Sequence, residues 1–405
     1  MNREVTSLGE LALLFLRLGA TAFGGPAAHI ALMRDEVVGR RRWLTEERFL
    51  DLLGAANLIP GPNSTELAIH VGFERRRWAG LVVAGVCFIG PAMLMTGAVG
   101  WAYVRFGARP RAVWLLWGVK PVILAIVVQA LWKLAPAAAR TWSLRALGAA
   151  AALGCALGGH ELVILLAAGV VAVAIQRFGG GGAAALVQAI PALPAAGAPE
   201  GERATSSATA TAGVVATTAA GAGAASVVVS ASALFWVFLK IGSVLFGSGY
   251  VLLAFLRTNL IERLHWLSQA QLIDAVAAGQ ITPGPVFTTA TFVGYVLAGP
   301  AGALAATAGI FLPAFVFVAL SGPLVPKLRG SRTAGAFLDG VNVASLALMA
   351  VVTAQLGRAA IVDAWTAALA LGAAVVLLRF KVSATWLIVA GAAVGLGAHA
   401  AGLAR

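Results

Sequence analysis

Two Pro-Gly-Pro triplets are the features of this 405-residue chain whose residue types most clearly suggest chemistry. They are Pro60-Gly61-Pro62 and Pro283-Gly284-Pro285. Proline removes a backbone donor and glycine permits a chain reversal, so each triplet predicts a break between two helices. Inside a membrane, a broken backbone is tolerated only where protein or water satisfies the freed polar groups. Each triplet is therefore either a binding site or a structural kink, and the duplication favours binding.

Polar residues flank both triplets and suit the binding of an anion. Asn63, Ser64 and Thr65 follow the first triplet, where a new helix should begin, and Thr288 follows the second. A helix N-terminus offers unpaired N–H groups and a partial positive charge. The hydroxyl groups could donate further hydrogen bonds to an anion or could merely cap the helix. Two amides placed three residues before the triplets complete this candidate set, Asn57 and Gln280.

Two cations lie within apolar segments, Arg17 and Lys240. A cation inside a membrane is costly and is by default a hypothesis for a functional site. The alternative is a side chain that snorkels to the interface. The two positions are equivalent in the internal repeat described below, so a function is favoured, with an anionic substrate as the partner that lowers the cost.

Glycines mark a second break in each half of the chain, at Gly24, Gly25 and Gly247. Without side chains, the backbone amides at these positions could approach a ligand directly. Close packing of helices explains Gly24 and Gly247 equally well.

Three acids lie close to the triplets. Glu66 follows the first triplet, where its carboxylate could exchange a proton and couple the site to a proton gradient, or could serve as a first-turn helix acid. Asp51 and Asp274 precede the two triplets at equivalent positions. For this pair we expect a structural hydrogen bond or a salt bridge.

The composition is that of an all-α integral membrane protein. Hydrophobic residues make up 60% of the chain, charged residues only 11%, and the mean hydropathy is +0.90; soluble proteins carry about 25% charged residues. The cationic residues that give the net charge of +13 lie between long apolar runs. There they set the orientation of the chain in the bilayer, which argues against nucleic acid as a partner. The five His and two Cys show no metal-ligand spacing, and no catalytic constellation is evident, so we expect no metal, no cofactor and no enzyme.

About ten segments are long and apolar enough to span a membrane, five in each half. In the first half they are roughly 8–25, 79–104, 112–132, 143–159 and 161–177. In the second half they are roughly 231–248, 300–321, 335–357, 360–378 and 384–402. The chain is thus predicted to consist of two repeats and a low-complexity flexible linker, at 1–178, 231–405 and 179–230.

The two halves are duplicates. A shift of 223 residues places residues 15–62 on 238–285, with fifteen identities over those 48 positions. With a shift of 222, Gly80, Pro91 and Gly118 coincide with Gly302, Pro313 and Gly340. Shared apolar composition alone would not align Phe-Gly, Trp-Leu and Pro-Gly-Pro at one offset, so the similarity of the two halves is not a chance alignment of apolar helices.

The arginines predict the orientation of the halves. Arginine triplets precede and follow the first Pro-Gly-Pro segment, at 40–42 and 75–77. If both ends remain cytoplasmic, in keeping with the positive-inside tendency, each Pro-Gly-Pro segment is a re-entrant hairpin. Five spans is an odd number, which makes the second repeat inverted. The alternative counts both segments as crossings and gives six spans per half and a parallel repeat.

These motifs together resemble the chromate ion transporter family in its two-domain form. They are the Phe-Gly-Gly-Pro turn at 23–26, the Arg-Trp-Leu-Thr stretch at 42–45 and the Asn-x-x-Pro-Gly-Pro break at 57–62, with the turn and the break repeated as Phe-Gly-Ser-Gly and Gln-x-x-Pro-Gly-Pro. The resemblance implies efflux of chromate with resistance to it, sulfate as a similar anion, and two homologous halves of opposite orientation. Pro26 is replaced by Gly249, and Asn63-Ser64 by Val286-Phe287, so we expect an asymmetric site weighted toward the first half.

The expected function is therefore transport of a tetrahedral oxyanion, chromate first, across the inner (plasma) membrane by alternating access. The alternatives are a carrier of sulfate or another small anion, and an anion channel. Proton coupling is a hypothesis, and the oligomeric state is left open, a homodimer included.

Overall fold

The computed structural model describes residues 6–23, 25–57, 59–107, 110–178, 229–245, 251–321, 331–380, 382 and 384–400. The described part is helical throughout. The helices of the first half are α1 (Leu8–Thr21), α2 (Gly25–Arg34), η1 (Asp35–Arg40), α3 (Glu46–Ala56), α4 (Asn63–Phe106), α5 (Pro110–Ala138), α6 (Trp142–Ala156) and α7 (Glu161–Phe178). Those of the second half are α9 (Ala231–Val244), α10 (Leu252–Leu256), η2 (Arg257–Arg263), α11 (Gln269–Ile281), η3 (Val286–Thr288), α12 (Thr289–Ser321), α14 (Arg332–Ala360), α15 (Ala364–Arg379) and α16 (Ala384–Ala400).

Five described segments are long and apolar enough to cross a membrane: Asn63–Phe106, Trp114–Ala138, Glu161–Phe178, Val286–Ser321 and Arg332–Arg358. Large apolar side chains face outward, as lipid contact requires; Trp132 and Trp142 are 71% and 81% exposed. The chain is therefore an integral membrane protein. The first predicted span, 8–25, corresponds to the shorter α1, and the count of ten spans stays a prediction.

Both Pro-Gly-Pro triplets lie between helices, as predicted: α3 ends before the first and α4 follows it, while α11 and η3 flank the second. A second interruption follows each triplet. Arg76 and Arg77 leave helical geometry inside α4, and Ala298 and Gly299 do so inside α12, 222 residues later. Both long helices are thus divided into a short first part and a long second part.

Ion pairs gather the ends of several helices at one end of the first half. Arg48 at the start of α3 donates to Glu74 at 2.8 Å, near the end of the first part of α4. Arg41, which follows η1, donates to Glu10 near the start of α1, also at 2.8 Å. The first ion pair joins the two arms of the α3–α4 hairpin, so the Pro-Gly-Pro break between them lies at the opposite end of these arms. The second joins the start of α1 to the end of η1, so the break between α1 and α2 lies at the opposite end as well.

Glycines permit the tight turns inside α4 and α12. A Cβ atom on Gly72 would overlap the backbone oxygen of Gly80, and one on Gly294 would overlap that of Gly302. The same close approach therefore occurs at positions 222 residues apart, and the two parts of each long helix pack against one another.

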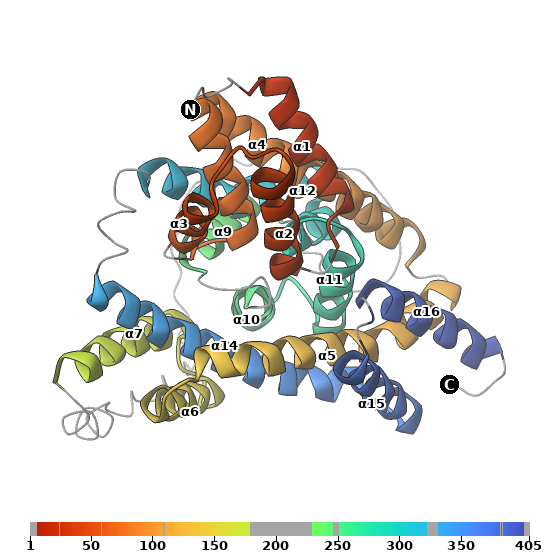
Figure 1. The fold of residues 1–405 in the computed structure, drawn as a ribbon. Helices are drawn as coiled ribbons and strands as arrows, with labels where there is room; N and C mark the ends of the chain where they lie inside the picture. Colours follow the sequence, from red (N-terminus) through yellow and green to blue (C-terminus); the bar gives the residue numbers. More distant parts are fainter. Residues whose placement is uncertain are drawn as a thin grey trace, which may run out of the picture.

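The helices form two layers (Figure 1). In the lower layer, α14 packs on α5, α6 and α7, and α5 packs on α15 and α16. In the upper layer, α4 packs on α1 and α12, and α12 packs on α9. Between the layers lies α11, which contacts α5, α14 and α16. The first triplet joins α3 to α4, which belongs to the upper layer, and the second follows α11, the helix between the layers.

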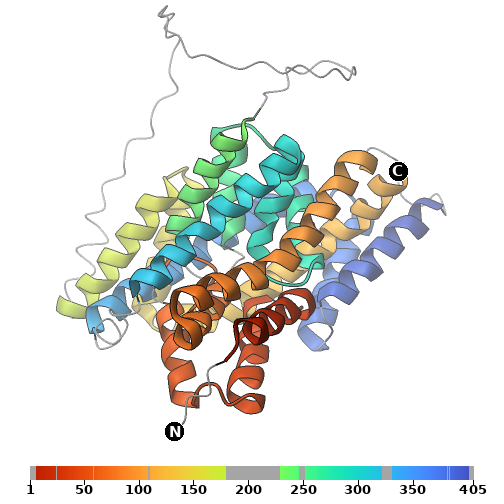
Figure 2. The same ribbon diagram turned by 90° about the horizontal axis from the view of Figure 1, so that it is seen from above.

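The second part of α4 and the first part of α12 run in the same direction, since Gly97 lies near Thr291 and Gly100 near Tyr295. The turn at Ala298 and Gly299 is consequently at the end of the molecule opposite the turn at Arg77. Figure 2 shows the result: α4 (orange) and the long part of α12 (teal to blue) run in opposite directions.

Gly72→Ala should destabilise the protein by about 1–3 kcal/mol, because the added methyl group meets backbone that cannot move aside. Thermal unfolding followed by size-exclusion chromatography in detergent measures the effect. Gly90→Ala in the same helix is the matched control, since a Cβ atom there meets nothing within 4 Å. Equal melting temperatures for the two variants would contradict the tight turn.

Candidate functional site

Two backbone hydrogen bonds cross between the halves and place the triplets. The N–H of Gly61 donates to the carbonyl of Leu245 at 2.8 Å, and the N–H of Gly284 donates to that of Ala22 at 2.9 Å. Leu245 and Ala22 directly follow α9 and α1, and their numbers differ by 223. Each triplet is thus bonded to the end of the first helix of the other half.

Only glycine fits at the centre of each triplet. Gly61 has φ of +140° and Gly284 has φ of +88°, a region that residues with a Cβ atom rarely adopt. A Cβ atom on Gly61 would overlap the carboxylate of Glu66, and one on Gly284 would lie 2.7 Å from the Cβ of Ala92. The triplets are packed too tightly for any other residue type.

Four polar side chains form two hydrogen-bonded pairs beside the first triplet. The hydroxyl of Ser64 donates to Nδ1 of His29 at 3.3 Å, and Nε2 of His29 donates to the carbonyl of Ala22 at 3.0 Å. The amide of Asn63 donates to Oδ1 of Asn57 at 2.6 Å. Through His29, Ser64 at the start of α4 is thus connected to the carbonyl of Ala22, which also accepts the N–H of Gly284.

The start of α4 also holds polar atoms that have no hydrogen-bond partner within the described part of the chain. Thr65 and Glu66 are 0% exposed, and neither the hydroxyl oxygen nor either carboxylate oxygen is paired. Oδ1 of Asn63 and Nε2 of His70 are also buried and have no hydrogen-bond partner among the described residues. Pro62 precedes the helix and no side chain caps it, so Ser64 and Thr65 are not caps. Buried polar groups are normally paired, and this cluster is therefore the strongest candidate for a ligand site.

The second triplet is more fully satisfied by the protein itself. Thr288 donates to the carbonyl of Pro285 at 2.8 Å, and Thr96 of α4 donates to Thr288 at 3.2 Å. Thr96 also lies 3.0 Å from the hydroxyl of Thr282. An unpaired amide nitrogen remains on Gln280, which lines a small cavity of about 10 Å³. Among the described residues, the second triplet therefore leaves fewer buried polar side-chain atoms unpaired than the first.

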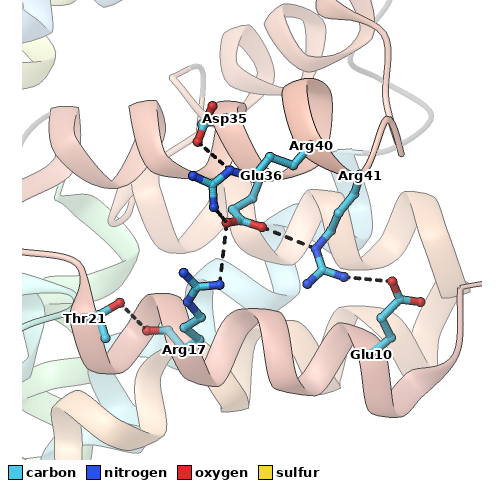
Figure 3. A network of polar contacts seen from close by, with 7 residues as sticks. All are labelled: Glu10, Arg17, Thr21, Asp35, Glu36, Arg40 and Arg41. Carbon is cyan, nitrogen blue, oxygen red and sulfur yellow. Dashed lines mark hydrogen bonds and ion pairs between the residues drawn. The ribbon is translucent and has the colours of Figure 1, made fainter.

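Arg17 belongs to an ionic cluster around the carboxylate of Glu36 (Figure 3). The guanidinium of Arg17 is 3.8 Å from this carboxylate and its side chain is 63% exposed, while Arg40 and Arg41 approach to 2.9 and 3.4 Å. Lys240, its counterpart, is exposed and has no ion pair among the described residues. The first predicted cation thus already has an acidic partner.

The structure brings most of the predicted residues together around the two triplets: Asn57, Pro60, Gly61, Pro62, Asn63, Ser64, Thr65 and Glu66 at the first, and Gln280, Pro283, Gly284, Pro285 and Thr288 at the second. Arg17 and Lys240 lie five residues before the crossed carbonyls, at Ala22 and Leu245. Gly25 begins α2 with φ of +76°. Gly24 and Gly247 lie outside the described residues.

Two polar residues at the triplets were not predicted from the sequence, His29 and Thr96. Their repeat equivalents are the apolar residues Leu252 and Val318. Most of the other candidates were found because both halves keep a similar residue, and that criterion could not find these two. The available signal was a polar residue within a short apolar stretch, which is too common to be specific.

The fold and the buried break define a multi-pass membrane protein with a polar centre. The sequence model of the chromate transporter family matches residues 9–174 and again 232–396. The chain therefore belongs to the chromate transporter family, a family of membrane transporters and not of enzymes.

Whole-chain relatives carry the same designation. The chain is 33% identical over 400 residues to a chromate transport protein of Cupriavidus metallidurans, covering 97% of this chain and 94% of that one. It is 30% identical over 358 residues to a chromate transport protein of Pseudomonas aeruginosa, covering 87% and 82%. It is 28% identical over 361 residues to a probable chromate transport protein of Synechococcus elongatus, covering 88% and 86%. No solved structure matches the chain.

Glu36→Gln should lower the melting temperature by several degrees, because it removes the charge that the clustered arginines share. Arg17→Gln should leave the melting temperature within a degree or two, since its ion pair is long and mostly exposed. Differential scanning fluorimetry of the purified variants measures both. A larger loss for Arg17→Gln than for Glu36→Gln would contradict this order.

Proposed function

We propose that this chain exports a tetrahedral oxyanion, chromate first, across the inner (plasma) membrane and so confers resistance to chromate. Membership of the family supports transport of chromate-type anions. The observation that carries the proposal is the cluster of buried, unpaired polar atoms at the start of α4. There the anion receives hydrogen bonds from the hydroxyl of Thr65, from the second N–H of the Asn63 side-chain amide, whose first N–H donates to Asn57, and from the free N–H groups of the first helical turn.

The proposed site extends from this cluster across both triplets. Ser64 and Asn57 support it from the first half, and Gln280 and Thr288 line it from the second. Arg17 and Lys240 add positive potential near the crossed carbonyls, and the guanidinium of Arg17 also lies 3.8 Å from the carboxylate of Glu36. A dianion buried without such partners would be highly unfavourable.

Glu66 is proposed as the proton-exchanging group. Its carboxylate lies against Gly61, and no described side chain pairs with it. An ionised carboxylate would repel a dianion bound at the same helix start, so the proton and the anion bind together. The membrane potential, negative inside, then favours outward movement by about 2.3 kcal/mol per 100 mV for each net negative charge carried.

Alternating access is proposed to use two inverted repeats, 1–178 and 231–405, joined by a flexible linker at 179–230 and carrying about ten spans. The opposite placement of the turns at Arg77 and Ala298 supports inversion. The contact between Arg48 and Glu74 supports a re-entrant hairpin, because both of its arms reach the same end of the molecule.

Sulfate is the second candidate substrate. It is a tetrahedral dianion like chromate, and the hydroxyl and amide groups at the first triplet select for shape and charge without a feature specific to chromium.

The direct test is flux in membrane vesicles that contain the purified protein. We expect saturable chromate transport with counterflow, and lower chromate accumulation in cells that express the protein. Arg17→Gln and Lys240→Gln should each greatly weaken it without loss of expression. Unchanged accumulation of chromate in these cells would contradict chromate as the substrate, and faster flux of sulfate than of chromate would make sulfate the substrate. Single-channel currents would show that the protein is a channel and not a carrier.

Thr65→Val should raise the KM for chromate by about 10–100-fold while leaving the melting temperature unchanged or higher, since a buried hydroxyl without a partner contributes no stability and a bond to a charged ligand is worth about 1.5–3 kcal/mol. Thr289→Val is the control, because the hydroxyl of Thr289 already donates to the carbonyl of Val286 in η3. Equal KM values in both variants would contradict the site.

Glu66→Gln should remove the rise in flux that acidification produces in the unmodified protein, because the substituted amide neither binds nor releases a proton. Initial chromate flux between pH 5.5 and 8.5 measures this dependence. A variant that keeps the original pH profile would exclude Glu66 as the coupling group.

A further inference from the structure

Equivalent faces in the two halves have different surroundings. In the second half, Ile273 of α11 is 4% exposed and Phe255 of α10 is 1% exposed. Their equivalents in the first half are Leu50 of α3, at 46%, and Leu32 of α2, at 41%. We call the surface of Leu32, Leu50 and Asp51 the α2–α3 face. It is an uncovered copy of the surface that α10 and α11 bury. The helices that carry it, α2 and α3, lie in the upper part of the molecule, away from the lower layer (Figure 1).

An ion pair anchors the buried copy on the lower layer. The ammonium of Lys120 on α5 is 3.4 Å from the carboxylate of Asp274, and the hydroxyl of Tyr103 donates to the same carboxylate at 2.9 Å. The side chain of Asp274 is 4% exposed, against 32% for its equivalent, Asp51. Ile273 and Ile123 of α5 line one cavity beside this pair.

The lower layer offers two equivalent surfaces. α7 packs on α14 as α16 packs on α5, and α6 packs on α14 as α15 packs on α5. The equivalents of Lys120 and Ile123 are Asn342 and Ser345 on α14. Asn342 is exposed, and the buried hydroxyl of Ser345 has no hydrogen-bond partner among the described residues. In the state described here α11 contacts α14 as well as α5, and α10 also contacts α14, so they cover part of this second surface, and α3 does not occupy it as α11 occupies the first.

We propose that the α2–α3 face docks on α14 around Asn342 in the opposite end state of the transport cycle, after α10 and α11 have left α5 and α14. The inference rests on the proposed function, because a second end state is required only of an alternating-access carrier. In that state Leu50 meets Ser345 as Ile273 meets Ile123 here, and Asp51 lies against Asn342. The ion pair of Lys120 and Asp274 exists in one end state alone, so it biases the carrier toward the state described here.

Paired cysteines test the docking in a background without Cys87 and Cys155. Ile123→Cys with Ile273→Cys reports the present state, and Leu50→Cys with Ser345→Cys reports the opposite one; both pairs leave Lys120 and Asp274 intact. A short bis-methanethiosulfonate reagent, which joins the two cysteines through disulfide bonds and releases two sulfinates, is applied to vesicles, and single-cysteine variants serve as controls. We expect both pairs to cross-link in protein that transports chromate, and each cross-link to block flux until it is reduced.

Lys120→Asn supplies an independent arm, because it gives α5 the residue that α14 has. We expect it to increase cross-linking of the Leu50–Ser345 pair by about fivefold, equivalent to about 1 kcal/mol. Active transport with cross-linking of the Ile123–Ile273 pair alone would overturn the docking and leave the proposed function standing. Cross-linking of both pairs without chromate flux would sustain the docking and overturn the substrate.

Discussion

The crossed hydrogen bonds of Gly61 and Gly284 are the constraint on which the rest of the site depends. Each break leaves backbone groups without helical partners, and such groups must be satisfied within a membrane. Here the satisfaction is reciprocal: the N–H of each triplet finds the carbonyl that ends the first helix of the other half. Neither half could form its break alone, so the duplication is part of the site's construction.

The two breaks share this backbone but differ in their side chains. At the second, hydroxyl groups of Thr96, Thr282 and Thr288 bond to one another and to nearby carbonyls. At the first, Thr65 and Glu66 are as deeply buried and have no described partner. A repeat thus supplies a common frame, within which one half retains polar groups for a ligand and the other uses its own for packing.

Local sequence was enough to predict the helix breaks, because proline and glycine act through their own backbone. It was also enough to predict a structural hydrogen bond or a salt bridge for Asp274, which makes both. It also supported the family, since the motifs form a specific combination. The crossed bonds, the pairing of Arg17 with Glu36 and the role of His29 were not predictable. These depend on which segments become neighbours, and a repeat offset identifies equivalent residues without identifying the residues they contact.

The central claim is that an oxyanion binds at the start of α4. Crystals grown with chromate and measured at the chromium absorption edge locate the metal atom of the bound anion directly through its anomalous signal. The account predicts a chromium peak with its oxygens within hydrogen-bond distance of Thr65 and Asn63. A peak confined to the arginine cluster around Glu36, with none beside the first triplet, would contradict it.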